Sequence, residues 1–158
     1  MSVQTGKPAP DFELDGSDNT DAGRHRYKLA DYRGQVVVLV FYPGDNTPVC
    51  TRQLNAYTDD IDRFAEVGAQ VLAISPQSVV SHDEFSCKQG GFAFPLLADT
   101  DKAVGEAYGI LGPLGFYRRS VFVIDAEGTV RWAHKAVAGL TFRPTSELIE
   151  AVRAAKTT

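Results

Sequence analysis

Hydrophobic and polar positions along the chain form short segments with distinct periodicities. The strongest pattern is the uninterrupted apolar run Val36–Phe41, which predicts a central parallel strand buried on both faces. Shorter apolar runs bounded by turn-forming residues predict four further strands. These are Val71–Ile74, Phe94–Leu97, Val121–Ile124 and Thr129–Ala133, the last two joined as a hairpin by Asp125–Gly128.

Helical spacing of apolar residues begins just after the central strand. Thr47 suits a helix N-cap and Pro48 the first helical position, and apolar residues then recur at helical spacing until Gly68. Three more helices are predicted from capping signals and spacing. They run from the capping box Ser81–Glu84 to near Gly90, from Asp101 to Tyr108, and from near Thr145 towards the C-terminus.

Strands that alternate with helices and end in a hairpin predict an α/β protein with a central mixed β-sheet flanked by helices. The 158 residues fit a single domain spanning positions 1–158, without an internal repeat or linker. The segment Asp15–Arg26 is polar and is expected to form a loop.

Composition and charge narrow the function. The net charge of −4 and the absence of a Lys/Arg cluster argue against a nucleic-acid partner. The longest apolar run, Val36–Tyr42, is far too short to span a membrane. The first residues lack the apolar core of a signal peptide, so we expect a cytoplasmic location, where thiols stay reduced. The two cysteines are then expected to be catalytic or buried, rather than a structural disulfide.

The segment Pro43–Cys50 is the richest in chemistry. It follows the carboxyl end of a buried strand, where open α/β sheets place their sites. With Thr47 as N-cap, Cys50 is the third helical residue, and free backbone N–H groups with the positive end of the helix dipole favour a thiolate there. On position alone, a buried hydrophobic cysteine is an equally good interpretation.

The pattern Pro43-x-x-x-Thr47-x-x-Cys50 resembles the active-site signature of the peroxiredoxins. Phe41–Thr51 is similar to the bacterioferritin comigratory protein, or peroxiredoxin Q, branch of that family. Gly6–Phe12 resembles the family's opening strand, and Leu29–Gly34 its turn into the central strand. Further matches in the same order are Phe94–Asp99, Ala107–Gly109 and Arg119–Asp125.

The resemblance implies a thioredoxin-like fold with the peroxiredoxin N-terminal extension. It also implies an enzyme that reduces hydrogen peroxide and organic hydroperoxides, is recycled by thioredoxin or a similar dithiol, and needs no metal or other cofactor. Many members of this branch are monomers, so a monomer is expected.

The resemblance assigns a role to each residue of the signature. Cys50 is the peroxidatic cysteine, Thr47 hydrogen-bonds the peroxide, Pro43 shields the thiolate from water, and Arg119 holds both thiolate and peroxide oxygens. Plainer interpretations stay open: a helix cap for Thr47, a strand terminator for Pro43 and a surface arginine for Arg119.

Cys87 is the internal candidate for the resolving cysteine, which the resemblance places in this helix for some members. Others carry it five residues after the peroxidatic cysteine, where this chain has Asn55. Two helical cysteines rarely approach within the roughly 7 Å between Cα atoms that a disulfide needs, so we expect local unwinding during turnover. The alternative is a one-cysteine enzyme resolved by an external thiol.

Two positions depart from the family pattern. Val49 stands where Gly usually precedes the peroxidatic cysteine, and Gln53 where Glu usually follows it. Gln53 can accept a hydrogen bond from an arginine but has no charge. The usual Glu–Arg orientation is therefore in doubt.

Two other functions are compatible with a reactive cysteine. A general thiol–disulfide oxidoreductase needs Cys-x-x-Cys, and Thr47 occupies the first of those positions. A non-enzymatic redox sensor shares the first chemical step and stays open. His25, His82 and His134 have no metal-ligand spacing, and His82 is assigned to the first turn of its helix.

Overall fold

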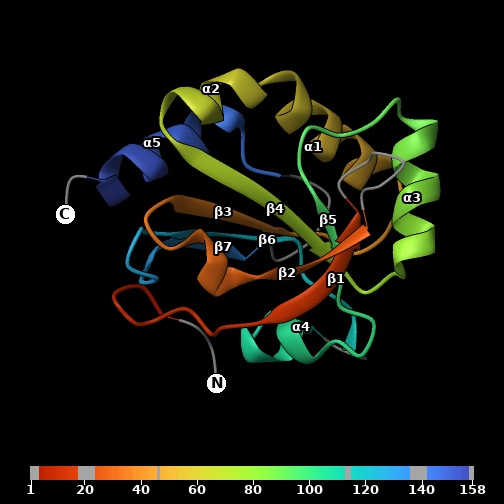
Figure 1. The fold of residues 1–158 in the computed structure, drawn as a ribbon, viewed down its shortest axis with the longest axis horizontal. Coiled ribbons are helices and arrows are strands. Elements are labelled where there is room, and N and C mark those ends of the chain that lie inside the picture. The colour runs from red at the N-terminus through yellow and green to blue at the C-terminus, as the bar shows by residue number, and fades with distance from the viewer. Residues whose placement is uncertain (1–3, 18–23, 46, 113–114, 136–141, 157–158) are drawn as a thin grey trace.

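The computed structural model describes residues 4–17, 24–45, 47–112, 115–135 and 142–156. These residues form one seven-stranded mixed sheet in the order β2-β1-β5-β4-β3-β6-β7 (Figure 1). The strands are β1 Glu13–Ser17, β2 Arg24–Lys28, β3 Val36–Phe41, β4 Ala69–Ser75, β5 Leu96–Ala98, β6 Ser120–Ile124 and β7 Val130–Lys135. The helices are η1 Leu29–Tyr32, α1 Pro48–Asp59, α2 Ile61–Glu66, α3 Val79–Lys88, α4 Ala103–Ala107 and α5 Thr145–Lys156.

The predicted central strand is confirmed as β3, and every residue of it is buried. It pairs parallel with β4 and antiparallel with β6, so it is parallel to only one neighbour. The predicted hairpin is also confirmed, because β6 and β7 pair antiparallel across the turn that begins at Asp125. The sheet is therefore mixed, as expected.

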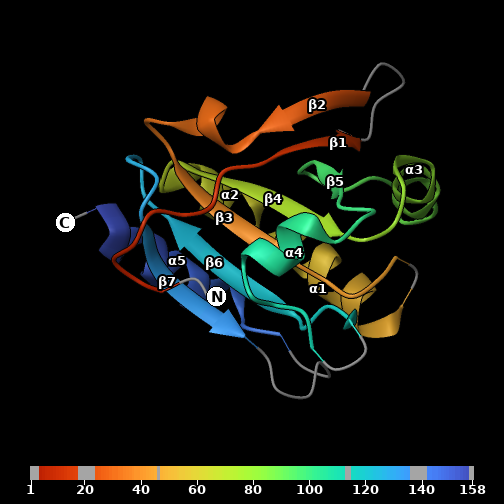
Figure 2. The same cartoon turned by 90° about the horizontal axis from the view of Figure 1, so that it is seen from below.

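The sheet is covered on both faces, and β3 contributes to both cores. Val36, Val38 and Val40 belong to the core beneath α1, α2 and α5. Val37, Leu39 and Phe41 belong to the opposite core, which also contains residues of α4 and η1. Figure 2 shows the same layers, with α4 on the face away from α1 and α5. None of the helices described is long and apolar enough to cross a membrane.

The helix predicted from Thr47 to Gly68 is two helices. Helix α1 ends at Asp59, and α2 starts at Ile61, because Asp60 leaves the helical conformation with φ −99° and ψ 15°. Two consecutive aspartates at a helix C-terminus oppose the helix dipole, whereas the same charges suit the start of the next helix. Tyr57 of α1 and Phe64 of α2 are both fully buried despite the break.

The start of α3 was also predicted at the wrong serine. Ser78, not Ser81, is the N-cap, since its hydroxyl accepts a hydrogen bond from the Ser81 N–H at 3.2 Å. The Ser81 hydroxyl instead donates to Asp45 Oδ2 at 2.7 Å. Ser81 is thus inside the helix and available for a tertiary contact.

The loop expected over Asp15–Arg26 is wrong at both of its ends, because β1 and β2 pair antiparallel with Asp15 opposite Arg26. Residues 18–23, between the two strands, lie outside the described residues. The two strands carry exposed ion pairs, such as Arg26 with Glu13 at 3.1 Å. Their sequence is therefore polar and resembles that of a loop. The expected opening strand Gly6–Phe12 is wrong as well. Only an isolated bridge from Pro8 to Thr129 forms there, since prolines at positions 8 and 10 lack an N–H donor.

Candidate active site

Cys50 lies where the sequence placed it, as the third residue of α1, shortly after the carboxyl end of β3. Thr47 has the extended conformation of an N-cap, and Pro48 is the first helical residue. The Thr51 N–H donates to the Thr47 carbonyl at 2.9 Å and closes the first turn. The sulfur therefore sits in the positive field of the first helical turn.

Arg119 reaches Cys50 from the neighbouring strand. It directly precedes β6, which pairs with β3, and its Nη2 lies 3.2 Å from Cys50 Sγ. The arginine is only 4% exposed, so the surface-arginine interpretation is wrong. The contact places the positive charge of a buried guanidinium directly against the sulfur.

Gln53 fixes the other side of the guanidinium. Its Oε1 accepts a hydrogen bond from Arg119 Nη1 at 2.6 Å, so the substitution for Glu keeps the arginine oriented. Gln53 Nε2 lies 3.5 Å from the Tyr57 hydroxyl, which donates to the Arg143 carbonyl at 2.7 Å. Burial raises the pKa of Tyr57 to about 12, so this hydroxyl stays a donor at neutral pH.

Thr47 does not cap α1 through its side chain. Its hydroxyl donates to the Gly44 carbonyl at 2.9 Å, and the residue is exposed. With its proton committed to Gly44, the hydroxyl oxygen can accept a hydrogen bond but has no second proton to donate. Pro43, at the beginning of the same loop, is half-buried.

The two cysteines have opposite exposure. Cys50 is 0% exposed, whereas Cys87, one residue before the end of α3, is exposed, and both are free thiols. Asn55 Nδ2 donates to Gln89 Oε1 at 3.0 Å, which joins α1 to the turn that follows Cys87. The structure therefore joins the middle of α1 to the C-terminal end of α3, and no disulfide is formed.

A buried polar cluster next to Cys50 was missed by the sequence reasoning. Asp45 accepts hydrogen bonds from Tyr42 and Ser81 and contacts His82, which is 0% exposed and lies at the end of the first turn of α3. The only hint in the sequence is an Asp within the signature and a Ser–His pair in the next predicted helix. No local pattern indicates that residues 37 positions apart meet.

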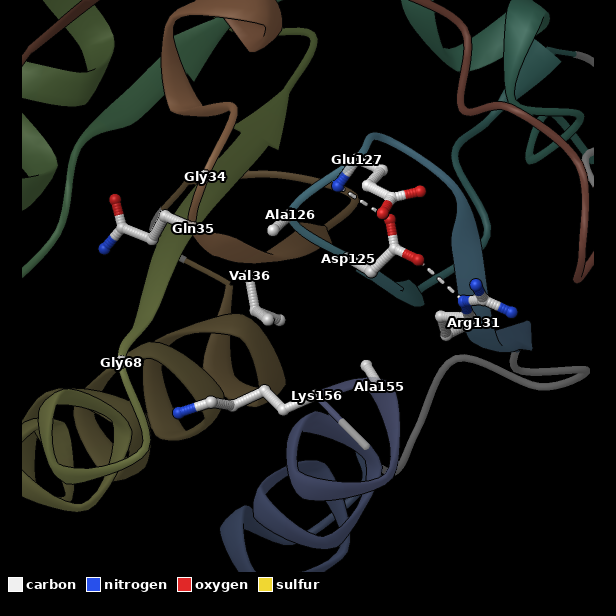
Figure 3. Close-up of a pocket in the computed structure, with 10 residues that line it drawn as sticks. All are labelled: Gly34, Gln35, Val36, Gly68, Asp125, Ala126, Glu127, Arg131, Ala155 and Lys156. Carbon is white, nitrogen blue, oxygen red and sulfur yellow. Dashed lines mark hydrogen bonds and ion pairs between the residues drawn. The ribbon is translucent and has the colours of Figure 1, made fainter. Parts of the chain in front are cut away.

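A cavity of 540 Å³ lies at the opposite end of β3, lined by residues such as Val36, Asp125, Arg131 and Lys156 (Figure 3). Three of its charged side chains, those of Asp125, Arg131 and Lys156, are engaged within the fold. Arg131 Nε donates to Asp125 at 2.7 Å, and Lys156 Nζ donates to the Val67 carbonyl at 2.9 Å. Neither cysteine lines this cavity, so we place the chemistry at Cys50.

Residues 5–133 match the AhpC/TSA family. The chain is 41% identical over 137 residues to peroxiredoxin-2 of Rattus norvegicus, covering 82% of this chain and 68% of the rat protein. It is 41% identical over 138 residues to peroxiredoxin tpx1 of Schizosaccharomyces pombe, covering 83% of this chain and 71% of the yeast protein.

Two solved structures resemble the fold closely. Mycobacterium bovis AhpC superposes with a TM-score of 0.90 at 21% identity, covering 99% of this chain and 94% of that chain. The reduced 2-Cys peroxiredoxin of Plasmodium vivax gives a TM-score of 0.89 at 26% identity, covering 97% and 82% of the two chains. The predicted thioredoxin-like α/β fold is confirmed.

Proposed function

This chain belongs to the AhpC/TSA family and is a peroxiredoxin-type peroxidase, and from that premise we propose that Cys50 is its peroxidatic cysteine. The substrates are hydrogen peroxide and small organic hydroperoxides. One observation carries the assignment: a buried arginine, Arg119, lies 3.2 Å from a buried cysteine sulfur in the first turn of a helix.

The reaction at Cys50 is a two-electron transfer to the peroxide. The thiolate attacks the terminal oxygen, so that an S–O bond forms as the O–O bond breaks. The sulfur becomes a sulfenic acid, and the departing alkoxide or hydroxide takes up a proton to leave as alcohol or water. Negative charge thus moves from sulfur to the leaving oxygen, and the site must receive it there.

Ionising a thiol is not by itself enough for this reaction. A cysteine with a pKa of about 8.5 is roughly 3% thiolate at pH 7, and lowering the pKa by about two units raises this to roughly 75%. Nucleophilicity falls with basicity, with a slope of about 0.45 for thiol exchange, so the net gain is only about threefold. The larger contribution has to come from donors that stabilise charge on the departing oxygen, and Arg119 is the nearest candidate.

Replacing Arg119 tests this role. We expect Arg119→Ala to lower kcat/KM for hydrogen peroxide by about 10²- to 10³-fold, the loss typical for a donor to a developing oxyanion. Stopped-flow kinetics, with the thiol titrated in parallel, separate this loss from the few-fold effect of ionisation. Arg119→Lys keeps the charge but loses the fork that spans Gln53 and sulfur, so an intermediate rate is expected. A loss no larger than the titration explains would contradict the role.

Thr47 and Pro43 complete the proposed site. Because the Thr47 hydroxyl already donates to Gly44, we assign it to accept a hydrogen bond from the peroxide O–H, which would orient the bound oxygen pair. Pro43, half-buried at the beginning of the same loop, is assigned to shield the Cys50 thiolate from water.

The sulfenic acid is resolved by Cys87. The Cys87 thiolate attacks the Cys50 sulfur, the S–O bond breaks, and the hydroxide leaves as water after protonation, which gives an intramolecular disulfide. Cys50 is buried and Cys87 exposed, so α3 and the first turn of α1 have to rearrange locally. Thioredoxin or a similar dithiol then returns both residues to thiols.

Intact mass spectrometry after one equivalent of peroxide tests the resolving step. Wild type is expected to lose two hydrogens, and Cys87→Ser to gain one oxygen instead. An oxygen gained and retained by wild type would indicate the one-cysteine alternative, with resolution by an external thiol.

Three finer assignments belong to the proposal. The peroxiredoxin Q branch rests on the match of Phe41–Thr51 to that subfamily. A catalytic role, as opposed to sensing, predicts sustained peroxide consumption with a reductant, whereas a sensor oxidises once and stops. The comparisons give no support to the expected monomer, and light scattering of the reduced protein determines the oligomeric state.

A further inference from the structure

A buried polar cluster joins the loop before Cys50 to the helix that carries Cys87. Asp45 lies in that loop, and its side chain is 2% exposed. Its Oδ1 accepts a hydrogen bond from the Tyr42 hydroxyl at 2.7 Å, and its Oδ2 accepts one from Ser81 Oγ at 2.7 Å. The same Oδ2 lies 2.8 Å from Nδ1 of His82. One carboxylate therefore connects the end of β3 with the first turn of α3.

Both ring nitrogens of His82 have polar partners. Nδ1 faces the Asp45 carboxylate, and Nε2 lies 2.9 Å from the Leu97 carbonyl oxygen of β5. This fully buried ring is therefore held on both sides by partners from other elements. Asp45 and His82 thus form a polar contact within the protein interior. Separating these groups leaves buried polar atoms without hydrogen-bond partners, which is costly, so the contact holds its two elements together firmly.

The position of this pair relates directly to the resolving step. His82 lies five residues before Cys87 on the same helix, and Asp45 lies five residues before Cys50. Figure 1 shows α3 at the end of the sheet where α1 begins. A disulfide requires the first turn of α1 and the end of α3 to approach each other, and the Asp45–His82 contact resists movement of either element.

We propose that Asp45 and His82 are positioning residues that lock α3 onto the Cys50 loop in the reduced enzyme, and that release of this contact admits Cys87 to the Cys50 sulfenic acid. The proposal rests on the Cys50–Cys87 resolution described above. While the lock is closed, the loop keeps Pro43 and Thr47 in the arrangement that receives peroxide. Once it opens, the enzyme changes from the oxidising step to the resolving step.

Weakening the lock should change the rate of disulfide formation with Cys87 more than the rate at which Cys50 reacts with peroxide. Asp45→Asn removes the negative charge with almost no change of shape, and Ser81→Ala removes one hydrogen bond to the same oxygen. Both variants are expected to speed disulfide formation after peroxide addition, by about threefold or more. Amide hydrogen exchange within Val79–Lys88 of the reduced protein is expected to rise by about tenfold, since local opening of α3 becomes easier.

The matched control is Glu84→Gln, which removes a carboxylate from the exposed face of the same helix. It is expected to leave both the exchange of α3 and the rate of disulfide formation unchanged. Sulfinic acid at Cys50 under excess peroxide provides a third readout. It should fall in Asp45→Asn and Ser81→Ala relative to wild type, because faster resolution leaves less sulfenic acid to oxidise.

The outcomes separate this inference from the proposed function. If wild type forms the disulfide but Asp45→Asn and Ser81→Ala form it no faster, the lock is overturned while Cys87 remains the resolving residue. If wild type forms no disulfide, the resolution by Cys87 fails and the gating role fails with it. Should Asp45→Asn not fold, the milder Ser81→Ala decides the question with the same measurements.

Discussion

Single residues at the Cys50 site show how a neutral side chain can position a cation. Gln53 is fully buried and presents Oε1 to Arg119 Nη1 at 2.6 Å, while the other guanidinium nitrogen lies against the sulfur. The guanidinium group is planar and rigid, so a hydrogen bond that fixes Nη1 also fixes the position of Nη2 relative to the sulfur. Gln53 thus acts on the reaction through Arg119 rather than by contact with peroxide.

Replacing Gln53 with Ala should release this orientation. We expect kcat/KM for hydrogen peroxide to fall by about tenfold, because small misplacements of a catalytic group are costly. Gln53→Glu restores an acceptor at the same place and is expected to recover most of the rate. Rapid kinetics under pseudo-first-order conditions measure both variants. Equal losses in the two would show that the acceptor at this position is unimportant.

Ser86, the residue before Cys87, is buried with an unsatisfied side chain. Its Oγ has no hydrogen-bond partner among the described residues. Burying a hydroxyl without a partner costs about 1–3 kcal/mol, and this cost disappears when α3 opens. Ser86→Ala is therefore expected to stabilise the protein by about 1 kcal/mol in urea unfolding and to slow disulfide formation. Unchanged stability together with faster disulfide formation would argue against a strained α3.

At the scale of elements, the edge of the sheet depends on a close approach between β1 and β5. Gly16 of β1 pairs opposite Leu97 of β5. A Cβ at position 16 would lie 2.5 Å from Leu97 Cδ2 and 2.9 Å from the Leu96 carbonyl oxygen. The backbone contact cannot be relieved by a rotamer change, so only glycine allows the two strands to pair this closely.

Gly16→Ala is predicted to destabilise the protein by about 1–3 kcal/mol, the usual cost of overpacking. Thermal or urea unfolding measures the loss. Glu13→Gln serves as control on the same strand, because it disturbs only exposed ion pairs of Arg26 and Lys28, whose contribution is small. A stability of Gly16→Ala equal to that of wild type would mean that β1 and β5 can separate without cost.

At the scale of the whole molecule, acid stability involves the turn between β6 and β7. Burial raises the pKa of Asp125, but hydrogen bonds from the Thr129 N–H, Arg131 and the Glu127 N–H outweigh it. The pKa of the Asp125 carboxyl group in the folded protein is therefore below its usual value of 3.8. A lowered folded pKa contributes stability above the unfolded pKa, and that stability is lost as the pH falls through the folded pKa.

The corresponding variant is Asp125→Asn. We expect its free energy of unfolding to be lower than that of wild type, with the largest difference near about pH 7. The difference should decrease as the pH drops below about 4, where Asp125 of wild type becomes protonated and also loses its charge. Urea unfolding at several pH values measures the difference, with Glu127→Gln on the same turn as an exposed control. A deficit that stays constant from neutral to acid pH would show that the charge of Asp125 contributes nothing.

The parts of this fold that were predictable from sequence are local. Val36–Phe41 is apolar throughout, and Thr47–Cys50 combines a cap position, a proline and a cysteine within one turn, so neither depends on distant contacts. Strand β2 was not predicted because it has no apolar pattern. It lies at the edge of the sheet, where Arg26 forms exposed ion pairs with Glu13 and Asp15 of β1. The cap of α3 was misplaced because Ser78 and Ser81 are both suitable, and only a tertiary partner, Asp45, decides between them.

The opposite exposure of the two thiols has a consequence for chemical selectivity. A reagent that diffuses to the folded protein meets Cys87 first, because Cys50 has no accessible surface in this conformation. Preference for Cys50 therefore cannot arise from encounter frequency. The preference has to arise from Arg119 and the N-terminus of α1, which stabilise the negative charge on the departing oxygen of a peroxide. Electrophiles whose reaction develops no such charge are expected to react with the exposed Cys87 instead.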